Sequence, residues 1–161
     1  MKITKIDEYL RDHPLFKGMV SEDITFISGC AKNVHFNEGD FLFRMGAAAD
    51  HFYIVRAGMA AIQLEAPGYG PATLQTLNVG DVAGWSWLFP PYEWHFDACA
   101  ATDIRATEFD AVCMRGKSED NPLLGYELMK RFSAIMADRL EATRLQLLDL
   151  YRNPSEPRRK R

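Results

Sequence analysis

The residues of this chain that could do metal chemistry are histidines that lie far apart in the sequence. His35, His51 and His95 could share a metal if the fold brought them together, because imidazole nitrogen is a common ligand of divalent metals. The sequence has no histidine-x-histidine spacing that would place two such ligands on one face of a strand. We therefore predict no metal centre and interpret the histidines as structural or surface residues.

Three cysteines could do thiol chemistry or bind a metal. Cys30, Cys99 and Cys113 are an odd number and lack C-x-x-C spacing, which argues against a disulfide framework and a zinc site. An iron–sulfur cluster would need four clustered thiolates, whereas these residues are scattered. We expect buried structural cysteines, no cofactor and a reducing, cytoplasmic setting.

An aromatic segment is the third candidate for a functional site. The stretch GWSWLFPPYEWHF, residues 84–96, contains all three tryptophans of the chain together with one histidine and two adjacent prolines. So much aromatic surface in a segment that resembles a connector could line a pocket, fill a pocket or belong to a core.

Composition limits the elements that could position these residues. The chain has 161 residues, 47% hydrophobic and 25% charged, which fits one compact domain with a core. A net charge of −3 gives no global attraction to nucleic acid or anionic membranes. The charged N-terminus does not resemble a signal peptide, and no apolar run is long enough for a membrane span.

The order of elements follows from the hydrophobic pattern. A first helix within residues 6–16 should be interrupted by Pro14, and Ser21 is predicted to be the N-cap of a second helix over residues 21–30. From about residue 33 to 112, short apolar or alternating segments bounded by turn residues predict the strands of a sandwich or barrel. After Pro122 the period becomes helical, and residues 126–151 contain no glycine or proline.

Two glycine-punctuated segments carry a family resemblance. EGDFLFRMG, residues 38–46, and DHFYIVRAGMA, residues 50–60, resemble the cyclic-nucleotide-binding domain of the catabolite activator and related Crp/Fnr-like regulators. The resemblance covers roughly residues 10–150. It implies a mainly β fold with flanking helices: a double-stranded antiparallel β-roll, jelly-roll-like, with N-terminal helices and a long C-terminal helix.

The same resemblance locates a phosphate-binding cassette in GDVAGWSWL, residues 80–88. In the family, a glutamate of this cassette binds the ribose, and an arginine further on binds the cyclic phosphate together with backbone amides. Here Trp85 stands at the glutamate position and Trp94 or His95 at the arginine position, and the chain has no arginine or lysine between Gly80 and Ile104. The cassette is therefore degenerate, and we expect no cyclic AMP or cyclic GMP binding of the family's usual kind.

We place the ligand pocket at this cassette and interpret its tryptophans mainly as core or pocket-filling residues. The cupins share the β-roll architecture, so a cupin-like metal-dependent enzyme is the alternative, although the cupin spacing H-x-H followed by glutamate is absent. A true cyclic-nucleotide-binding regulator is a further alternative. The predicted ligand-pocket residues are Gly84, Trp85, Ser86, Trp87, Leu88, Trp94 and His95.

The C-terminal helix, expected over about 122–151, carries one apolar stripe at steps of three and four residues. In the resembled family the corresponding helix pairs with its twin, so we expect a homodimer. Only a short basic tail, residues 152–161, follows where the DNA-binding relatives have a helix-turn-helix, so we expect no sequence-specific DNA binding by this chain alone. The stripe consists of Met129, Phe132, Met136, Leu140, Thr143, Leu147 and Leu150.

The sequence therefore predicts one cyclic-nucleotide-binding-like domain, residues 1–151, that is not an enzyme. We expect a regulatory or sensory module that binds a small molecule other than cyclic AMP or cyclic GMP, or a protein partner, and that has no membrane association.

Overall fold

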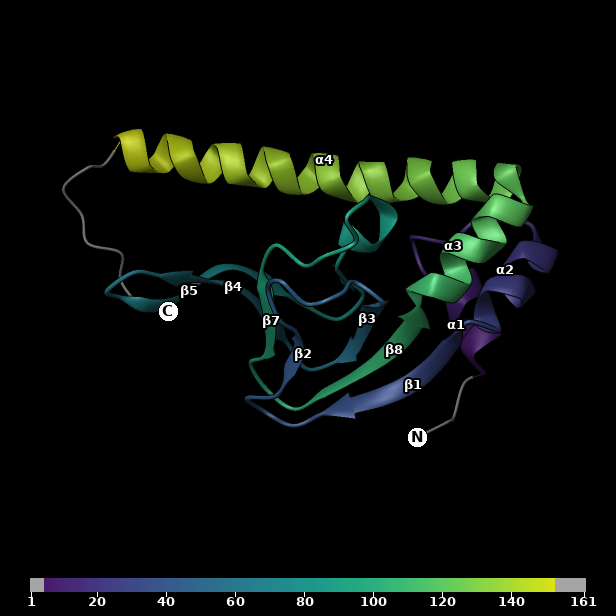
Figure 1. Ribbon diagram of the computed structural model, residues 1–161, viewed down its shortest axis with the longest axis horizontal. Helices are drawn as coiled ribbons and strands as arrows, with labels where there is room; N and C mark the ends of the chain where they lie inside the picture. Colours follow the sequence, from purple (N-terminus) through teal and green to yellow (C-terminus); the bar gives the residue numbers. More distant parts are fainter. Residues whose placement is uncertain (1–4, 153–161) are drawn as a thin grey trace.

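The computed structural model of the protein describes residues 5–152. Two short helices precede an antiparallel β-roll, and two further helices follow it, the last of which runs along the length of the molecule (Figure 1). This arrangement confirms the predicted mainly β fold with N-terminal helices and a long C-terminal helix. The elements are α1 Ile6–Asp12, α2 Ser21–Ser28, β1 Ala31–Phe36, β2 Phe41–Phe43, β3 His51–Ala57, β4 Ala60–Ala66, β5 Gly70–Leu77, β6 Val82–Ala83, the 3-10 turn η1 Ser86–Leu88, β7 Asp97–Ala100, β8 Ile104–Asp110, α3 Ala111–Asp120 and α4 Pro122–Arg152.

Two four-stranded sheets make up the roll. Their strand orders are β1-β8-β3-β6 and β2-β7-β4-β5, and all pairings are antiparallel. Successive side chains of a strand point to opposite faces of its sheet, so every second side chain lies between the two sheets. Val55, Leu77 and Ile104 are fully buried there. Half of the buried residues of this inter-sheet core are alanines.

A second core joins the roll to the helices. Phe52 of β3 stacks on Phe109 of β8 at 4.5 Å and on Trp87 of η1 at 4.8 Å between ring centroids. Phe132 of α4 meets both Phe52 and Trp87 edge-on, so one aromatic cluster ties strand, cassette and helix together. We call α1, α2, α3, the first half of α4 and this aromatic core the base of the molecule.

The predicted helix starts need one correction. Ser21 is the first helical residue of α2 rather than its N-cap, and Val20 occupies the cap position without a side-chain hydrogen bond. The Ser21 hydroxyl instead accepts a hydrogen bond from Arg11 at 2.6 Å, which joins α1 to α2. The first helix ends at Asp12, before Pro14, as expected from the missing amide hydrogen of proline.

Helix α3 was not predicted. It begins directly where β8 ends, with no glycine or proline between them, so the sequence offers no turn signal. Asp110 caps it, because its carboxylate accepts a hydrogen bond from the backbone amide of Cys113 at 2.9 Å. Pro122 then starts α4, in keeping with the tolerance of proline at the first helical position.

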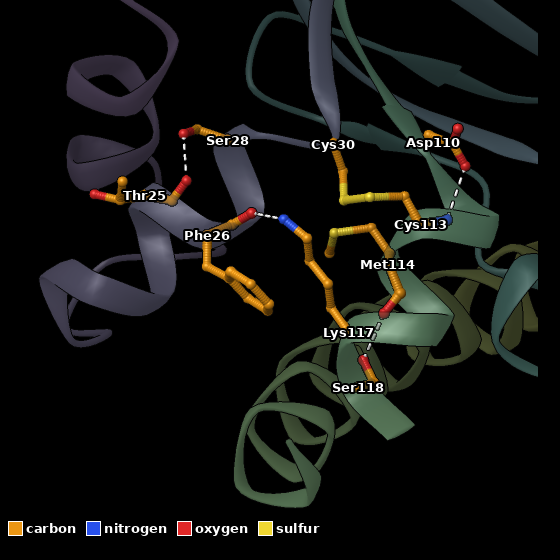
Figure 2. Close-up of a disulfide and its surroundings, with 9 residues drawn as sticks. All are labelled: Thr25, Phe26, Ser28, Cys30, Asp110, Cys113, Met114, Lys117 and Ser118. Atoms are coloured by element: carbon orange, nitrogen blue, oxygen red, sulfur yellow. Dashed lines mark hydrogen bonds between the residues drawn. A yellow bond between two sulfur atoms is a disulfide. The ribbon is translucent and has the colours of Figure 1, made fainter. Parts of the chain in front are cut away.

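The cysteine prediction was wrong for two of the three residues. Cys30 and Cys113 form a disulfide (Figure 2) with a Cα–Cα separation of 5.9 Å. Cys99 is a free thiol. The pairing follows from the register of β1 and β8, in which Ala31 faces Phe109, so the residue before β1 lies beside the start of α3. Because disulfides persist mainly in oxidising compartments, this pair weighs against the reducing setting that the sequence suggested.

The two ends of α4 have different surroundings. Leu124, Leu128 and Phe132 are buried in the base, whereas every residue from Leu140 to Arg152 is exposed. Figure 1 shows the later part of the helix passing over the side of the roll where β4 and β5 lie. The predicted basic tail lies outside the described residues, apart from Arg152.

Candidate functional site

A cleft of about 320 Å³ lies between the roll and the second half of α4. Its walls come from β2, β4 and β5, from the cassette segment and from one face of the helix. Such a concave, mainly apolar site with a few polar groups is the usual form of a small-molecule site. The lining residues are Phe43, Ile62, Leu74, Gln75, Gly84, Trp85, Ser86, Trp94, His95, Phe96, Met136, Arg139, Leu140 and Thr143.

Trp94 fills the floor of the cleft against Gly84. Its indole stacks on Phe43 with ring centroids 3.8 Å apart and planes 12° from parallel, and the residue is buried. A Cβ at Gly84 would lie 2.4 Å from indole Cη2, and Gly84 has a φ of +99°, so only glycine is tolerated there. Backbone hydrogen bonds to Gly46 and Ala47 fix Trp94 in this position.

Trp85 carries the contact between the cassette and α4. The guanidinium carbon of Arg139 lies 4.7 Å from the centroid of the Trp85 ring, within cation–π range. Arg139 also donates a hydrogen bond to the carbonyl oxygen of Val82, directly before the cassette glycine turn. Burial lowers the pKa of Arg139, and the charge of Asp81 partly opposes that shift. The side chain remains a cation at neutral pH.

The mouth of the cleft is more polar than its floor. The Ser86 hydroxyl lies 3.3 Å from His95 Nδ1, and His95 is exposed. Thr143 of α4 and Gln75 of β5 add a hydroxyl and an amide. The sequence left open whether Trp94 or His95 stands at the family's arginine position. In the structure Trp94 is buried at the floor of the cleft, and His95 is exposed at its mouth.

Two predicted pocket residues lie elsewhere. Trp87 is 1% exposed in the base, where it packs between Phe52 and Phe132. Leu88 also packs against the base rather than lining the cleft. The 3-10 turn accompanies this separation, because Ser86 at its start lines the cleft while Trp87 and Leu88 after it pack against the base. Arg115 of α3 holds the turn by donating a hydrogen bond to the Trp87 carbonyl at 2.9 Å.

The predicted dimer stripe is divided along α4. Phe132 is buried in the base, while Met136, Leu140 and Thr143 line the cleft. Met129 at 38% exposure, Leu147 at 49% and Leu150 at 53% present apolar surface to solvent. The stripe is therefore one feature in sequence and has three different environments in space.

Arg139 is the site residue that sequence reasoning missed. It is not part of the predicted stripe, yet Met136, Arg139, Leu140 and Thr143 share one helix face at spacings i, i+3, i+4 and i+7. Phe43, Leu74 and Gln75 were also missed, because the long-range return of β2 and β5 to the cassette leaves no local signal.

The candidate metal residues are not brought together. His35 lies on β1, His51 on β3 and His95 at the cleft mouth, and within residues 5–152 no group of three or more histidine, cysteine or acidic residues could hold a metal ion. None of the helices in that same range combines the length and the apolar character needed to cross a membrane.

Comparison with known sequences identifies similar proteins. A family model described as a cyclic nucleotide-binding domain matches residues 33–121. The CRP-like cAMP-activated global transcriptional regulator of Mycobacterium tuberculosis is 27% identical over 145 residues, which cover 90% of this chain and 63% of that protein. Human cGMP-dependent protein kinase 2 is 25% identical over 107 residues, 66% of this chain and 13% of the kinase.

Solved structures show the same architecture. A chain from Geobacter metallireducens that is assigned as a cyclic nucleotide-binding protein has a TM-score of 0.76 at 25% identity, covering 83% of this chain and 97% of its own. The Thermus thermophilus catabolite activator protein has a TM-score of 0.66 at 23% identity, covering 86% of this chain and 63% of its own. The latter likeness concerns the fold alone.

Proposed function

This chain belongs to the cyclic nucleotide-binding domain family, and from this membership we propose that it is a non-catalytic regulatory module whose cleft does not take cyclic nucleotides in the usual way. It has the fold of a cyclic nucleotide-binding regulatory domain. The observation that carries the finer proposal is the Trp94 indole against Gly84, at the floor of the cleft. The ring occupies the space beside the Gly84 Cα into which a side chain would project, so that space is closed to a ligand.

The loss of polar contacts supports the same proposal. Trp85 stacks with Arg139 and offers no carboxylate for a ribose hydroxyl. The cassette segment supplies no arginine for a cyclic phosphate, and the guanidinium that lines the cleft, that of Arg139, comes from α4 and stacks on Trp85. Each missing charge-assisted hydrogen bond removes about 1.5–3 kcal/mol. Two such losses amount to a fall in affinity of roughly a few hundred-fold.

We further propose that the exposed part of α4 pairs with a second copy of the chain. Apolar residues at Leu147 and Leu150 continue the stripe beyond the body of the molecule, where no described residue covers them. A helix that leaves such a stripe uncovered commonly buries it in a coiled coil. Because α4 also forms one wall of the cleft, an occupant of the cleft would act directly on this pairing.

Native mass spectrometry of freshly purified protein tests the regulatory role. We expect a dimer, with or without a retained organic ligand, and no bound metal. A stoichiometric metal bound to a monomer would contradict the proposal and favour the enzyme alternative.

Cyclic nucleotide titration tests the cassette proposal. We expect the tryptophan fluorescence of the wild-type protein to show no saturable response to cyclic AMP or cyclic GMP below high micromolar concentrations. The double change Trp85→Glu and Trp94→Arg supplies a ribose acceptor and a cation and also removes the ring from Gly84, so it should strengthen binding, measured by calorimetry. A tight, saturable response of the wild type to cyclic AMP would show that the cassette works despite its sequence.

A further inference from the structure

We propose that the cleft binds a small amphipathic carboxylic acid, whose carboxylate pairs with Arg139 and whose apolar body lies against the aromatic wall. This inference rests on the proposed regulatory function and names the class of ligand for the same cleft. Two observations support it: the apolar residues that line the cleft, and the charge and contacts of Arg139.

The walls of the cleft favour an apolar body. Phe43, Ile62 and Leu74 of the roll line the cleft together with Met136 and Leu140 of α4, and Trp85 and Trp94 add aromatic surface. Burial of apolar ligand surface against such walls contributes about 25 cal/mol for each Å². A ribose or a phosphate placed here would lose its hydration without a matching set of polar partners.

Arg139 provides the single permanent charge of the cleft. Among the lining residues within 5–152 there is no carboxylate and no other lysine or arginine. Of the described residues, only Val82 accepts a hydrogen bond from its guanidinium, and none forms an ion pair with it. The planar fork of a guanidinium has five N–H donors, so donors remain for a ligand.

A carboxylate is the anion that this arrangement fits best. One guanidinium binds both oxygens of a carboxylate through two parallel hydrogen bonds, whereas a phosphate has further oxygens that would need other donors. The cation–π contact with Trp85 holds the guanidinium in place before the ligand arrives, which reduces the ordering needed on binding. Trp94 also fills the space beside the Gly84 Cα, which narrows the room for a larger anion at the cassette.

The volume limits the ligand to a small molecule. At about 320 Å³, the cleft lies at the lower end of the range of about 300–1,000 Å³ for small-molecule sites. The polar mouth formed by Ser86 and His95 leaves room for one hydroxyl or amide on the ligand.

Decanoate and decanol test this inference, because they share a chain and differ in the charged head. Tryptophan fluorescence and calorimetry with the whole chain, below the micelle concentration, should show saturable decanoate binding at least about tenfold tighter than decanol binding. Arg139→Gln should abolish this preference, whereas Arg139→Lys should retain part of it.

Arg144→Gln is the matched control, because Arg144 is exposed on the same helix and does not line the cleft. It should leave the preference for decanoate unchanged, and circular dichroism should show that all variants are folded. Equal binding of decanol and decanoate, undiminished preference in Arg139→Gln, or no binding of decanoate would each overturn the inference. A different ligand retained in native mass spectrometry would then leave the regulatory function standing, whereas a metal-bound monomer would overturn that function itself.

Discussion

Both halves of α4 carry apolar residues at helical spacing, but those residues are buried in the first half and exposed in the second half. In the first half, Leu124, Leu128 and Phe132 are each at most 1% exposed and hold the base together. In the second half, the apolar residues from Leu140 onward are roughly half exposed, and the helix contributes the wall of a cleft. Apolar residues of the first half therefore contribute to stability, and those of the second half are free to serve binding.

The tryptophans of the cassette repeat this contrast over a few residues. Trp87 points into the base and stacks in its aromatic core, whereas Trp85 and Trp94 face the cleft. A single 3-10 turn separates the two directions. The base and the cleft therefore meet at η1. We expect a substitution in one of these two regions to leave the structure of the other largely intact.

The largest effect is expected from Phe132→Ala in the base. Removing a fully buried ring that touches both Phe52 and Trp87 leaves a cavity, and such changes lower the free energy of unfolding by about 3–5 kcal/mol. Urea unfolding followed by circular dichroism measures the loss. Leu145→Ala is the control, because Leu145 is 58% exposed and lies off the stripe, and it should change stability by no more than about 0.5 kcal/mol. Similar losses of unfolding free energy in the two variants would contradict the assignment of stability to the first half of α4.

The disulfide should be the next largest contributor, and it also belongs to the base. Replacing both Cys30 and Cys113 by alanine removes a crosslink across a sequence separation of 83 residues and should cost about 2–4 kcal/mol in unfolding free energy. Wild-type protein in reductant should show the same loss, while Cys99→Ala should be equally sensitive to reductant. Three alkylatable thiols in unreduced, denatured protein would contradict the pairing; we expect one.

The order of helices and strands could be predicted because its local signals are strong, while the β-roll itself was implied by the family resemblance. Glycines at positive φ, such as Gly39, Gly46 and Gly58, mark turns that the chain must make, and the change from short segments to a long helical period marks the start of α4. Helix α3 left no such signal, since β8 runs into it without a break, and Ser21 looked like a cap although Val20 holds that position.

The site was harder to predict because its contacts are distant in sequence. The family resemblance indicated the substitution at Trp85 but left the arginine position open between Trp94 and His95, and which indole faces the cleft depends on a 3-10 turn without a clear signature. Arg139 could be recognised as a site residue only once the face of α4 that carries it was known to contact Trp85. The disulfide likewise depended on strand register, which spacing between cysteines cannot reveal.

A smaller effect, on association rather than folding, is expected from Leu147→Asp in the exposed second half of α4. A charge in the seam of a paired α4 would be buried without a partner, so the dimer dissociation constant should rise by about 100-fold. Sedimentation velocity measures the shift, and the monomer's fold should be unchanged. Leu145→Asp places the same charge off the stripe and should remain dimeric. A wild type that is monomeric at high concentration would remove the basis for this pairing.

The smallest effect should come from His13, which joins the two regions. Its Nε2 lies 2.8 Å from the carbonyl oxygen of Gly80, at the start of the cassette, while its Nδ1 accepts a hydrogen bond from the Leu15 amide. This pattern requires the neutral ring with the proton on Nε2. Burial lowers the pKa of His13 below its ordinary value of 6.5, although the Gly80 carbonyl and Asp81 partly oppose that shift.

The sign of the pH dependence follows from that lowered pKa. Below about pH 6.5 the unfolded chain binds a proton at His13 more readily than the folded chain does, so acidification favours unfolding. The stability that neutral His13 provides is complete above pH 6.5 and is lost as the pH falls toward the lower folded value. Urea midpoints at about pH 7.5 and 5.5 should therefore separate wild type from His13→Gln more at the higher pH, because glutamine can donate to Gly80 without titrating. A difference between the two proteins that stayed constant or grew on acidification would show that His13 is not the group that couples the base to the cassette.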